Sequence, residues 1–383
     1  MINVGIIGSG FIGPAHIEAL RRLGFVNVVA LCDSSLESAQ QKAQQLNIPF
    51  AYGEPDALLQ HEGLDVVHNC TPNHLHAAIN KKILLAGKHI FSEKPLCMTS
   101  EEAGELLSLA EKTGVVHGVS FVYRQFAMVQ QAASMIRQQQ AGRIFAVHGS
   151  YLQDWMLFDT DYNWRITPEQ GGISRAVADI GSHWCDTVQF VTGRKITEVM
   201  ADFSIVHPRR KASTGSSSTF SAQQAPAQYE EVEVQTEDFA SILLRFDDGS
   251  KGSLIVSQVS AGRKNRLAFE INASELSLGW DQEIPQHLWV GHRNKANQQL
   301  SDDASLLTDE AAAAVHFPGG HAEGWPDAFK NMMMNFYRFI HEGKIPGRDP
   351  ANFATFHEGA NVMFIIDAVV RSHREQRWIK VSS

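Results

Sequence analysis

Short apolar runs alternate with amphipathic stretches through the first third of the chain. Apolar residues in the amphipathic stretches recur every three or four positions, as is typical of helices. The pattern predicts helices over residues 14–23, 35–46, 74–86 and 100–112, and strands near residues 4–7, 28–31, 66–67, 89–91 and 115–119. Thr99 and Glu102 predict a capping box at the start of the last of these helices. Apolar strands that alternate with helices predict a doubly wound parallel sheet, of the α/β class, over residues 1–122.

Residues 123–383 have a different pattern, in which several strands follow one another without helices between them. We expect strands over residues 142–151, 196–206, 238–247, 250–259 and 265–272, and helices over residues 128–140, 179–192, 323–342 and 351–374. Asp248-Gly249 between two of the strands is a hairpin signal. The pattern predicts an α+β domain on a large, mostly antiparallel sheet, with helix 351–374 packed back on the first domain. The small polar residues of 209–228 predict a mobile surface loop.

Composition narrows the class of protein. The chain has 383 residues, 44% of them hydrophobic and 20% charged, which is typical of a globular protein. A net charge of −9 gives no basic field for nucleic acid or for an anionic membrane. The start of the chain predicts a strand rather than a signal peptide, and no apolar run approaches the roughly 18 residues of a membrane span. We therefore expect a soluble, cytoplasmic protein.

Cysteine and histidine spacing bears on metal sites and disulfides. The four cysteines, Cys32, Cys70, Cys97 and Cys185, are scattered and predict buried, reduced thiols. Although there are 17 histidines, none of the usual zinc-binding spacings occurs, so we expect no metal. His316 and His321 are expected to line a loop rather than to bind zinc.

A glycine turn follows the first predicted strand. Gly8-Ser9-Gly10-Phe11-Ile12-Gly13 is a G-x-G-x-x-G sequence that opens a helix, and Asp33 lies 20 residues beyond Gly13 at the end of the next strand. In Rossmann domains the glycines admit a pyrophosphate and the acid binds a ribose diol. The pattern therefore predicts a dinucleotide site. Asp33, followed by Ser34 and Ser35 rather than by arginine, favours NAD over NADP.

Two further turns follow later strands of the same sheet, where the cofactor edge is expected. One of them is Cys70-Thr71-Pro72-Asn73-His74-Leu75-His76. This segment is expected to border the cofactor, to begin a helix with Asn73 as its cap, or to do both. Lys94, in Glu93-Lys94-Pro95, is either a solvated surface ammonium or a cation that stabilises negative charge on a substrate oxygen.

Asp179 and His183 lie four residues apart in a predicted helix, and they share one of its faces. Histidine can accept a proton near neutral pH, and a carboxylate can orient it. By themselves the two residues predict either an ordinary polar contact or a general base with its partner.

Four motifs, in this order along the chain, resemble the Gfo/Idh/MocA oxidoreductase family: the glycine turn, Glu93-Lys94-Pro95, Trp164-Arg165, and Gly171-Gly172 to Asp179-x-x-x-His183. The resemblance covers nearly the whole chain. It implies an NAD(P)-dependent dehydrogenase that acts on hydroxyl groups of sugars, sugar derivatives or cyclitols, with NAD as the expected cofactor. Residues 151–155 and 317–325 are similar to dehydrogenases of pyranosides or anhydrosugars. Alternatives are a keto-sugar reductase, an NAD-requiring glycosidase and a non-catalytic NAD-binding regulator.

The resemblance also implies roles for individual residues. His183 would remove the hydroxyl proton, Lys94 would stabilise the alkoxide, and Asp179 would position His183 or contact the substrate. The expected cofactor-binding residues are Gly8, Ser9, Gly10, Phe11, Ile12, Gly13, Asp33, Thr71, Asn73, His76, Glu93, Lys94, Trp164 and Arg165. The expected substrate-binding residues are Lys94, Arg124, Asp154, Asp179, His183 and His321.

Other aromatic and apolar residues have a structural and a functional interpretation. Trp155, Trp164 and Trp325 form either a platform for a sugar face or part of the core. Residues 332–334, three methionines on a predicted helix, are expected to serve packing. An antiparallel sheet with one open face predicts a homodimer or homotetramer formed through that sheet.

Overall fold

The computed structural model describes residues 1–213 and 229–382, and the chain divides into two compact units. Unit 1 comprises Met1–Gln125 and Trp325–Met363, and unit 2 comprises Phe126–Gly324 and Phe364–Ser383. The division falls within helix α11, Phe356–Glu375.

Unit 1 is built on a six-stranded parallel sheet. Its strands are β1 (Ile2–Ile7), β2 (Val26–Cys32), β3 (Phe50–Tyr52), β4 (Val66–Asn69), β5 (His89–Ser92) and β6 (His117–Val119). Their order in the sheet is β3-β2-β1-β4-β5-β6, and all neighbouring pairs are parallel. The order reverses direction between β1 and β4, which is the position where a doubly wound sheet binds its ligand. The predicted α/β class is confirmed.

The helices of unit 1 are α1 (Ile12–Arg21), α2 (Leu36–Gln45), α3 (Pro55–Leu59), α4 (Asn73–Leu85), α5 (Ser100–Thr113), the short turn η1 (Val122–Gln125) and α10 (Trp325–His341). Helices α1, α2, α4 and α5 follow the predicted alternation, whereas α3 and η1 were not predicted and α10 was expected in the second half of the chain. Helix α10 packs against α1 and η1. The Thr99 side chain accepts a hydrogen bond from the Glu102 N–H, as the capping box predicts.

The predicted cap of α4 is wrong. Asn73 is the first residue of the helix, and Pro72 occupies the cap position without a side-chain hydrogen bond. Asn73 is buried and lies inside the helix, one residue after the position from which a capping side chain accepts the unpaired N–H groups of the first turn.

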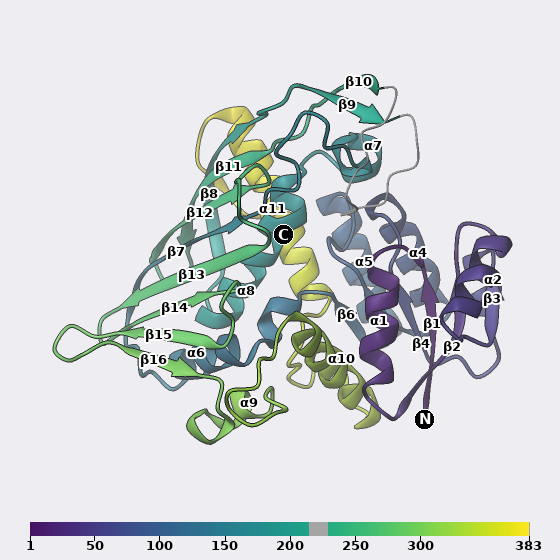
Figure 1. The fold of residues 1–383 in the computed structure, drawn as a ribbon, viewed down its shortest axis with the longest axis horizontal. Coiled ribbons are helices and arrows are strands. Elements are labelled where there is room, and N and C mark those ends of the chain that lie inside the picture. Colours follow the sequence, from purple (N-terminus) through teal and green to yellow (C-terminus); the bar gives the residue numbers. More distant parts are fainter. Residues whose placement is uncertain (214–228, 383) are drawn as a thin grey trace. The chain divides into compact units, whose positions relative to one another are not determined.

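Unit 2 is built on a nine-stranded sheet (Figure 1). The strands are β7 (Ile144–Leu152), β8 (Ile196–Ser204), β11 (Phe239–Phe246), β12 (Lys251–Ser257), β13 (Arg266–Ala273), β14 (Ser277–Asp281), β15 (His287–Gly291), β16 (Gln298–Ser301) and β17 (Ile379–Lys380). Their order in the sheet is β16-β15-β14-β13-β7-β12-β11-β8-β17. All pairs are antiparallel except β7 with β12. The predicted hairpin joins β11 to β12, and Gly249 takes the left-handed conformation (φ +87°) that the turn requires.

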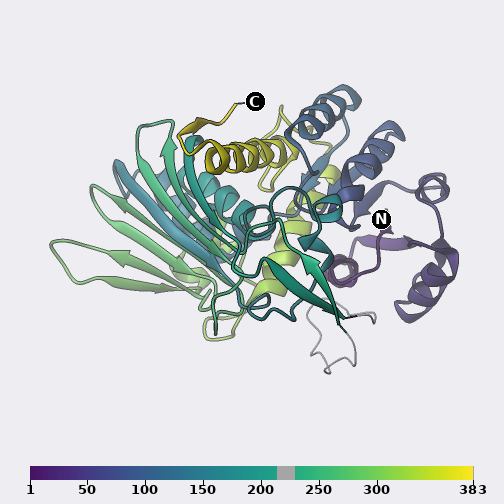
Figure 2. The same ribbon diagram turned by 90° about the horizontal axis from the view of Figure 1, so that it is seen from above.

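The helices of unit 2 are α6 (Ala127–Arg137), α7 (Pro168–Gly171), α8 (Ser182–Thr192) and α9 (Asp309–Ala312), with the short turns η2 (Trp164–Ile166), η3 (Val177–Gly181) and η4 (Ala304–Leu306). Helices α6 and α8 pack on each other, α6 contacts β14 and β15, and α8 contacts β7. The C-terminal part of α11 hydrogen-bonds to β8 through Ser372 and His373. Figure 2 shows helices α6 and α8 and the C-terminal part of α11 on one side of the sheet, and no described helix of this unit covers its other face.

Three sequence expectations in this half need correction. Residues 209–213 form strand β9 (Arg209–Ser213), paired with β10 (Tyr229–Glu233), rather than the start of a loop; the rest of the expected loop lies outside the described residues. The helix expected from residue 179 begins earlier, as the π-helical turn η3 that continues into α8. The helix expected from residue 351 begins at Phe356. None of the described helices is long and apolar enough to cross a membrane.

Candidate functional site

The glycine turn between β1 and α1 has the geometry of a phosphate-binding loop. Gly8 has φ +97°, and a Cβ there would lie 2.6 Å from the Cys70 carbonyl oxygen. A Cβ at Gly13 would lie 2.3 Å from the Gly8 oxygen, so this position requires glycine for the close approach of helix and strand. A Cβ at Gly10 would meet nothing within 4 Å in the described chain. The side of the turn at Gly10 is therefore open for a ligand at the N-terminus of α1, and these residues fit a bound pyrophosphate.

Asp33 follows β2 and is held by three donors. Its Oδ2 accepts hydrogen bonds from the Ser9 hydroxyl and, at 3.0 Å, from the Ser38 hydroxyl, and its Oδ1 accepts the Ser34 N–H at 2.7 Å. The structure thus brings Ser9 and Asp33 together, as expected for a ribose site beside the glycine turn. Sequence reasoning missed Ser38, although its place one turn into the helix that follows Asp33 could have indicated it.

The turn after β4 is tied to the turn after β5. The Nδ1 of His76 contacts the Pro95 carbonyl oxygen at 2.6 Å, and its Nε2 contacts the Thr71 carbonyl oxygen at 2.8 Å. The imidazole is buried, and both of its nitrogens contact the backbone of this chain. The Thr71 hydroxyl donates to Asn69 Oδ1 at 2.7 Å. His76 therefore holds two turns at the edge of the sheet where the cofactor is expected.

Glu93 is a buried carboxylate beside Lys94. Its Oε1 contacts His16 Nε2 at 2.9 Å, and its Oε2 accepts the Lys94 backbone N–H at 3.1 Å. Burial by itself would raise the pKa of Glu93, but the hydrogen bond and charge interaction with His16, together with the nearby charge of Lys94, outweigh it and lower the pKa to about 2. Glu93 is thus ionised, and it holds the backbone at the residue whose ammonium group is the expected electrostatic catalyst. Lys94 itself is half-buried.

In unit 2, Asp179 lies in η3 and is held by two side chains. The Gln258 Nε2 donates to Asp179 Oδ2 at 2.9 Å, and the Arg165 Nε lies 3.6 Å from Asp179 Oδ1. The Arg165 guanidinium also lies 4.4 Å from the centre of the Trp164 ring. His183 follows in the first turn of α8 and is 7% exposed. The structure therefore joins Trp164, Arg165 and Asp179 in one network; the sequence contained no signal for Gln258.

The helical run that carries Asp179 and His183 is anchored at its start by Glu237. This buried carboxylate accepts the Ser174 hydroxyl at 2.7 Å and the Val177 N–H at 2.9 Å, and it also receives the Arg175 N–H. The Val177 N–H belongs to the first turn, whose N–H groups have no partner within the helix, and Ser174 and Arg175 lie directly before it. Because the first turn is fixed from outside, the positions of Asp179 and His183 follow from Glu237 as well as from the helix itself.

The remaining expected substrate residues are described by their own surroundings. Asp154 accepts hydrogen bonds from Lys264 Nζ at 2.7 Å and from the Gly262 N–H at 3.1 Å. His321 is exposed, and its Nδ1 contacts the Pro318 carbonyl oxygen. Arg124 is buried in η1. Their roles toward substrate stay predictions.

Trp155 and Trp325, two of the tryptophans expected either to contact a sugar or to pack in the core, lie in different surroundings. Trp155 packs on the small cluster of Met156, Ile166 and Val234, and the Trp325 ring lies tilted against the Phe329 ring with ring centres 4.7 Å apart. In the methionine run, Met332 and Met333 are buried, as the packing interpretation predicts. Within the described ranges, no group of three or more His, Cys, Asp or Glu residues is arranged to hold a metal ion.

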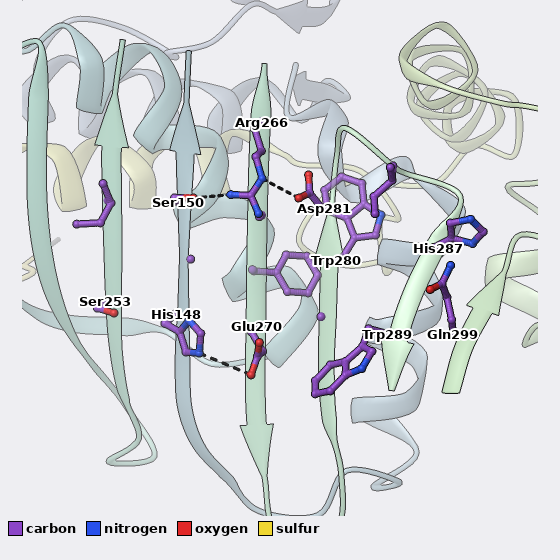
Figure 3. Close-up of a pocket in the computed structure, with 16 residues that line it drawn as sticks. His148, Ser150, Ser253, Arg266, Glu270, Trp280, Asp281, His287, Trp289 and Gln299 are labelled. Atoms are coloured by element: carbon purple, nitrogen blue, oxygen red, sulfur yellow. Dashed lines mark hydrogen bonds and ion pairs between the residues drawn. The ribbon is translucent and has the colours of Figure 1, made fainter. Parts of the chain in front are cut away.

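A hollow of about 560 Å³ lies on the uncovered face of the nine-stranded sheet (Figure 3). Arg266 pairs with Asp281 at 2.7 Å and reaches the Ser150 hydroxyl at 3.3 Å, while His148 lies 3.8 Å from Glu270. Trp289 borders the hollow and is 37% exposed. The hollow thus combines apolar surface with charges of both signs.

Comparison with known proteins gives consistent matches along the chain. Residues 2–121 match the Gfo/Idh/MocA oxidoreductase family model with its NAD-binding Rossmann fold, and residues 129–278 match the Gfo/Idh/MocA C-terminal domain. The levoglucosan dehydrogenase of Pseudarthrobacter phenanthrenivorans is 28% identical over 99% of this chain and 98% of its own. The D-glucoside 3-dehydrogenase of Escherichia coli is 30% identical over 50% of this chain and 54% of its own. A solved structure of levoglucosan dehydrogenase with NADH and L-sorbose has a TM-score of 0.89, 26% identity and coverage of 100% and 99% of the two chains.

Proposed function

This chain belongs to the Gfo/Idh/MocA family of oxidoreductases, and we propose that it is an NAD-dependent dehydrogenase that oxidises a ring hydroxyl of a pyranose or anhydro-pyranose sugar. The observation that carries the proposal is the dinucleotide turn, in which the Gly10 side is open while three donors hold the Asp33 carboxylate. The relatives named levoglucosan and glucoside dehydrogenases support the substrate class.

In the proposed reaction the hydroxyl carbon loses a hydride and the hydroxyl oxygen loses a proton, which leaves a ketone. Bound NAD would supply the acceptor for the hydride. His183 removes the hydroxyl proton, because a neutral imidazole accepts a proton near neutral pH. Lys94 stabilises the negative charge that develops on the oxygen. Asp179, itself held by Gln258 and Arg165, orients His183 or the substrate.

A panel of sugars tested with NAD and with NADP examines this proposal. Reduced nicotinamide is followed by its absorbance with levoglucosan, alkyl glucosides, free hexoses and inositols as substrates. We expect turnover with at least one pyranose-type sugar and a preference for NAD, because the Asp33 carboxylate would repel a 2′-phosphate. The double variant Asp33→Ser/Ser34→Arg is expected to narrow or reverse that preference by about tenfold or more, since charge-assisted hydrogen bonds are roughly twice as strong as neutral ones.

The control for this panel is Asp56→Ser, which removes a carboxylate that pairs with Lys82 on the surface. It should leave the cofactor preference unchanged. Equal or better use of NADP by the unmodified protein contradicts the assignment of Asp33. If no sugar is turned over while NAD binds tightly, the dehydrogenase proposal fails and a regulator that binds NAD is favoured.

We also propose that the uncovered sheet face binds a second copy of this chain, giving a homodimer or homotetramer. Leu243 and Ile255 project from this face, are 51% and 37% exposed, and lie on adjacent paired strands. Large exposed apolar side chains on one sheet face are typical of an interface. The hollow beside them carries both Arg266 and Glu270, so one copy offers complementary charges to another.

Light scattering tests the interface. The unmodified protein is expected to have a mass that is a multiple of 42.4 kDa, and the variant Leu243→Lys/Ile255→Lys to shift toward 42.4 kDa, because buried lysines in an apolar interface lack partners. Leu306→Lys, at an exposed position in η4, serves as the control. A monomeric unmodified protein, or an unchanged mass in the double variant, contradicts the interface.

We propose a cytoplasmic location. All four cysteines are free and buried, which suits a reducing compartment. Burial raises the pKa of the Cys185 thiol to about 12, and the same effect raises the pKa of the Cys70 thiol well above its ordinary value. These thiols are therefore protonated and unreactive, as expected of packing residues.

A further inference from the structure

A chain of four polar side chains runs through the apolar interior of unit 1 and ends at the turn that carries Lys94. The Tyr337 hydroxyl lies 2.7 Å from His68 Nε2, His68 Nδ1 lies 2.7 Å from His16 Nδ1, and His16 Nε2 lies 2.9 Å from Glu93 Oε1. These residues, the buried relay, come from four elements: α10, β4, α1 and the end of β5.

The relay is enclosed by aromatic rings. His16, His68 and Tyr337 are fully buried, and Glu93 is 7% exposed. The His68 ring stacks on Phe91 with centres 5.3 Å apart, and the His16 ring meets Phe329 edge-on at 5.0 Å. Burial lowers the pKa of His68 well below its ordinary value and raises the pKa of Tyr337 well above its own. Both side chains are therefore neutral at physiological pH.

The contacts determine the direction of the hydrogen bonds. Within the described part of the chain, the Tyr337 hydroxyl meets only His68 Nε2, so that nitrogen must accept the tyrosine proton. A neutral His68 then carries its single proton on Nδ1 and donates it to His16 Nδ1. His16 in turn carries its proton on Nε2 and donates it to the Glu93 carboxylate. Every group is satisfied, and all donors point toward the one anion at the end.

The reverse direction leaves a buried group unsatisfied. If His68 donated to Tyr337, the tyrosine proton would have no acceptor among the described residues. His16 would also have to donate from both nitrogens, which requires a buried imidazolium paired with Glu93. An unsatisfied buried donor costs about 1–3 kcal/mol. The arrangement that ends on Glu93 is therefore the favoured one.

We propose that Tyr337, His68 and His16 are positioning residues for the reaction, because they fix Glu93 and through it the backbone of Lys94. This inference rests on the proposed function, in which Lys94 acts on the reacting oxygen. The last link is the Lys94 N–H, which donates to the second Glu93 oxygen at 3.1 Å. Apolar residues of similar size would fill this interior without any need for matched donors. The relay instead holds one ionised carboxylate, that of Glu93, in a fixed position at the turn that carries Lys94.

Tyr337→Phe tests the relay with almost no change in shape. It removes the donor that fixes the proton on His68, so the hydrogen bond from His16 to Glu93 is no longer imposed. We expect kcat for sugar oxidation to fall about five- to tenfold, the equivalent of one buried hydrogen bond, while the KM for NAD stays within about twofold. Tyr52→Phe is the matched control, because Tyr52 makes the same kind of bond, 2.8 Å to His61, away from the relay.

A double-mutant cycle separates positioning of Lys94 from a general structural role. If the relay acts through Lys94, Tyr337→Phe should lower the residual turnover of the Lys94→Ala variant by less than about twofold. The same five- to tenfold loss in both backgrounds, or no loss in either, overturns the inference. If Lys94→Ala alone has normal turnover, the role of Lys94 in the proposed function fails, and this result is distinct from a failed cycle.

Two variants of His16 give a second readout. His16→Ala removes the donor to Glu93 and should lower kcat more than Tyr337→Phe does. His16→Gln keeps an N–H that can reach the carboxylate and an oxygen that can accept from His68, so part of the activity should return. Equal kcat values for the alanine and glutamine variants, with both folded by thermal unfolding, contradict the relay.

Discussion

Replacing His183 by alanine is expected to lower the rate of sugar oxidation by roughly 10²–10⁴-fold, the usual contribution of a positioned general base. His183 is 7% exposed and follows Asp179 along one helical run, so another side chain cannot readily take its place. In the unmodified protein, kcat/KM should rise with pH as one histidine-like group loses its proton, because only the neutral imidazole accepts the hydroxyl proton. The His183→Ala profile should lack this limb.

Asp179→Asn provides the complementary measurement. It keeps the size of the side chain but removes the charge that faces Arg165 and Gln258, so the limb should move along the pH axis. Because the two residues are expected to act as a unit, the double variant should lose little beyond the worse single one. His292→Ala, in the turn after β15, is a control for loss of an imidazole elsewhere. Additive losses, or a profile that His183→Ala leaves unchanged, would place the base elsewhere.

Lys94→Ala is expected to lower turnover by roughly 10²–10³-fold, the cost of removing one group that stabilises an oxyanion. NAD binding, followed by fluorescence titration, should change little, because the glycine turn and Asp33 are unaltered. Lysine is held at this position by a backbone bond to Glu93, so the loss should fall on kcat rather than on KM for the cofactor. Lys81→Ala, on the exposed side of α4, removes a solvated ammonium as a control.

The result would decide between the two interpretations of Lys94. If the variant has normal turnover, Lys94 is a solvated surface ammonium and has no part in the proposed mechanism. A variant that loses NAD affinity in parallel with turnover would assign Lys94 to cofactor binding alone. Only a loss of turnover with retained NAD affinity supports stabilisation of the oxygen.

The sequence by itself determined the features that depend on neighbouring residues. The spacing of Gly8, Gly10, Gly13 and Asp33 predicts the dinucleotide turn, because a tight turn, a helix start and a strand end are local structures. The Thr99 cap and the Gly249 hairpin follow from the same local rules. The family resemblance, which the comparisons confirm, also rests on short ordered motifs.

Local reasoning failed where packing or pairing between distant segments decides the outcome. Asn73 has the composition of a helix cap, but Pro72 takes that place and the asparagine is buried. Residues 209–213 look like the start of a polar loop, yet they form a strand because residues 229–233 supply a pairing partner. Likewise, the parallel pairing of β7 with β12 joins segments about one hundred positions apart. Such pairings depend on the complete sheet rather than on the propensity of one strand.

The supports of the candidate site were decided by tertiary structure alone. His16 lies 52 positions from His68 and 77 from Glu93, and Tyr337 lies 269 positions from His68. Gln258 reaches Asp179 across 79 positions. Local patterns extend over a few residues, whereas a hydrogen bond between side chains requires atoms within about 3 Å, and only the folded chain supplies that proximity. The sequence therefore indicated which residues could carry the chemistry, and the tertiary structure decided which side chains hold them in place.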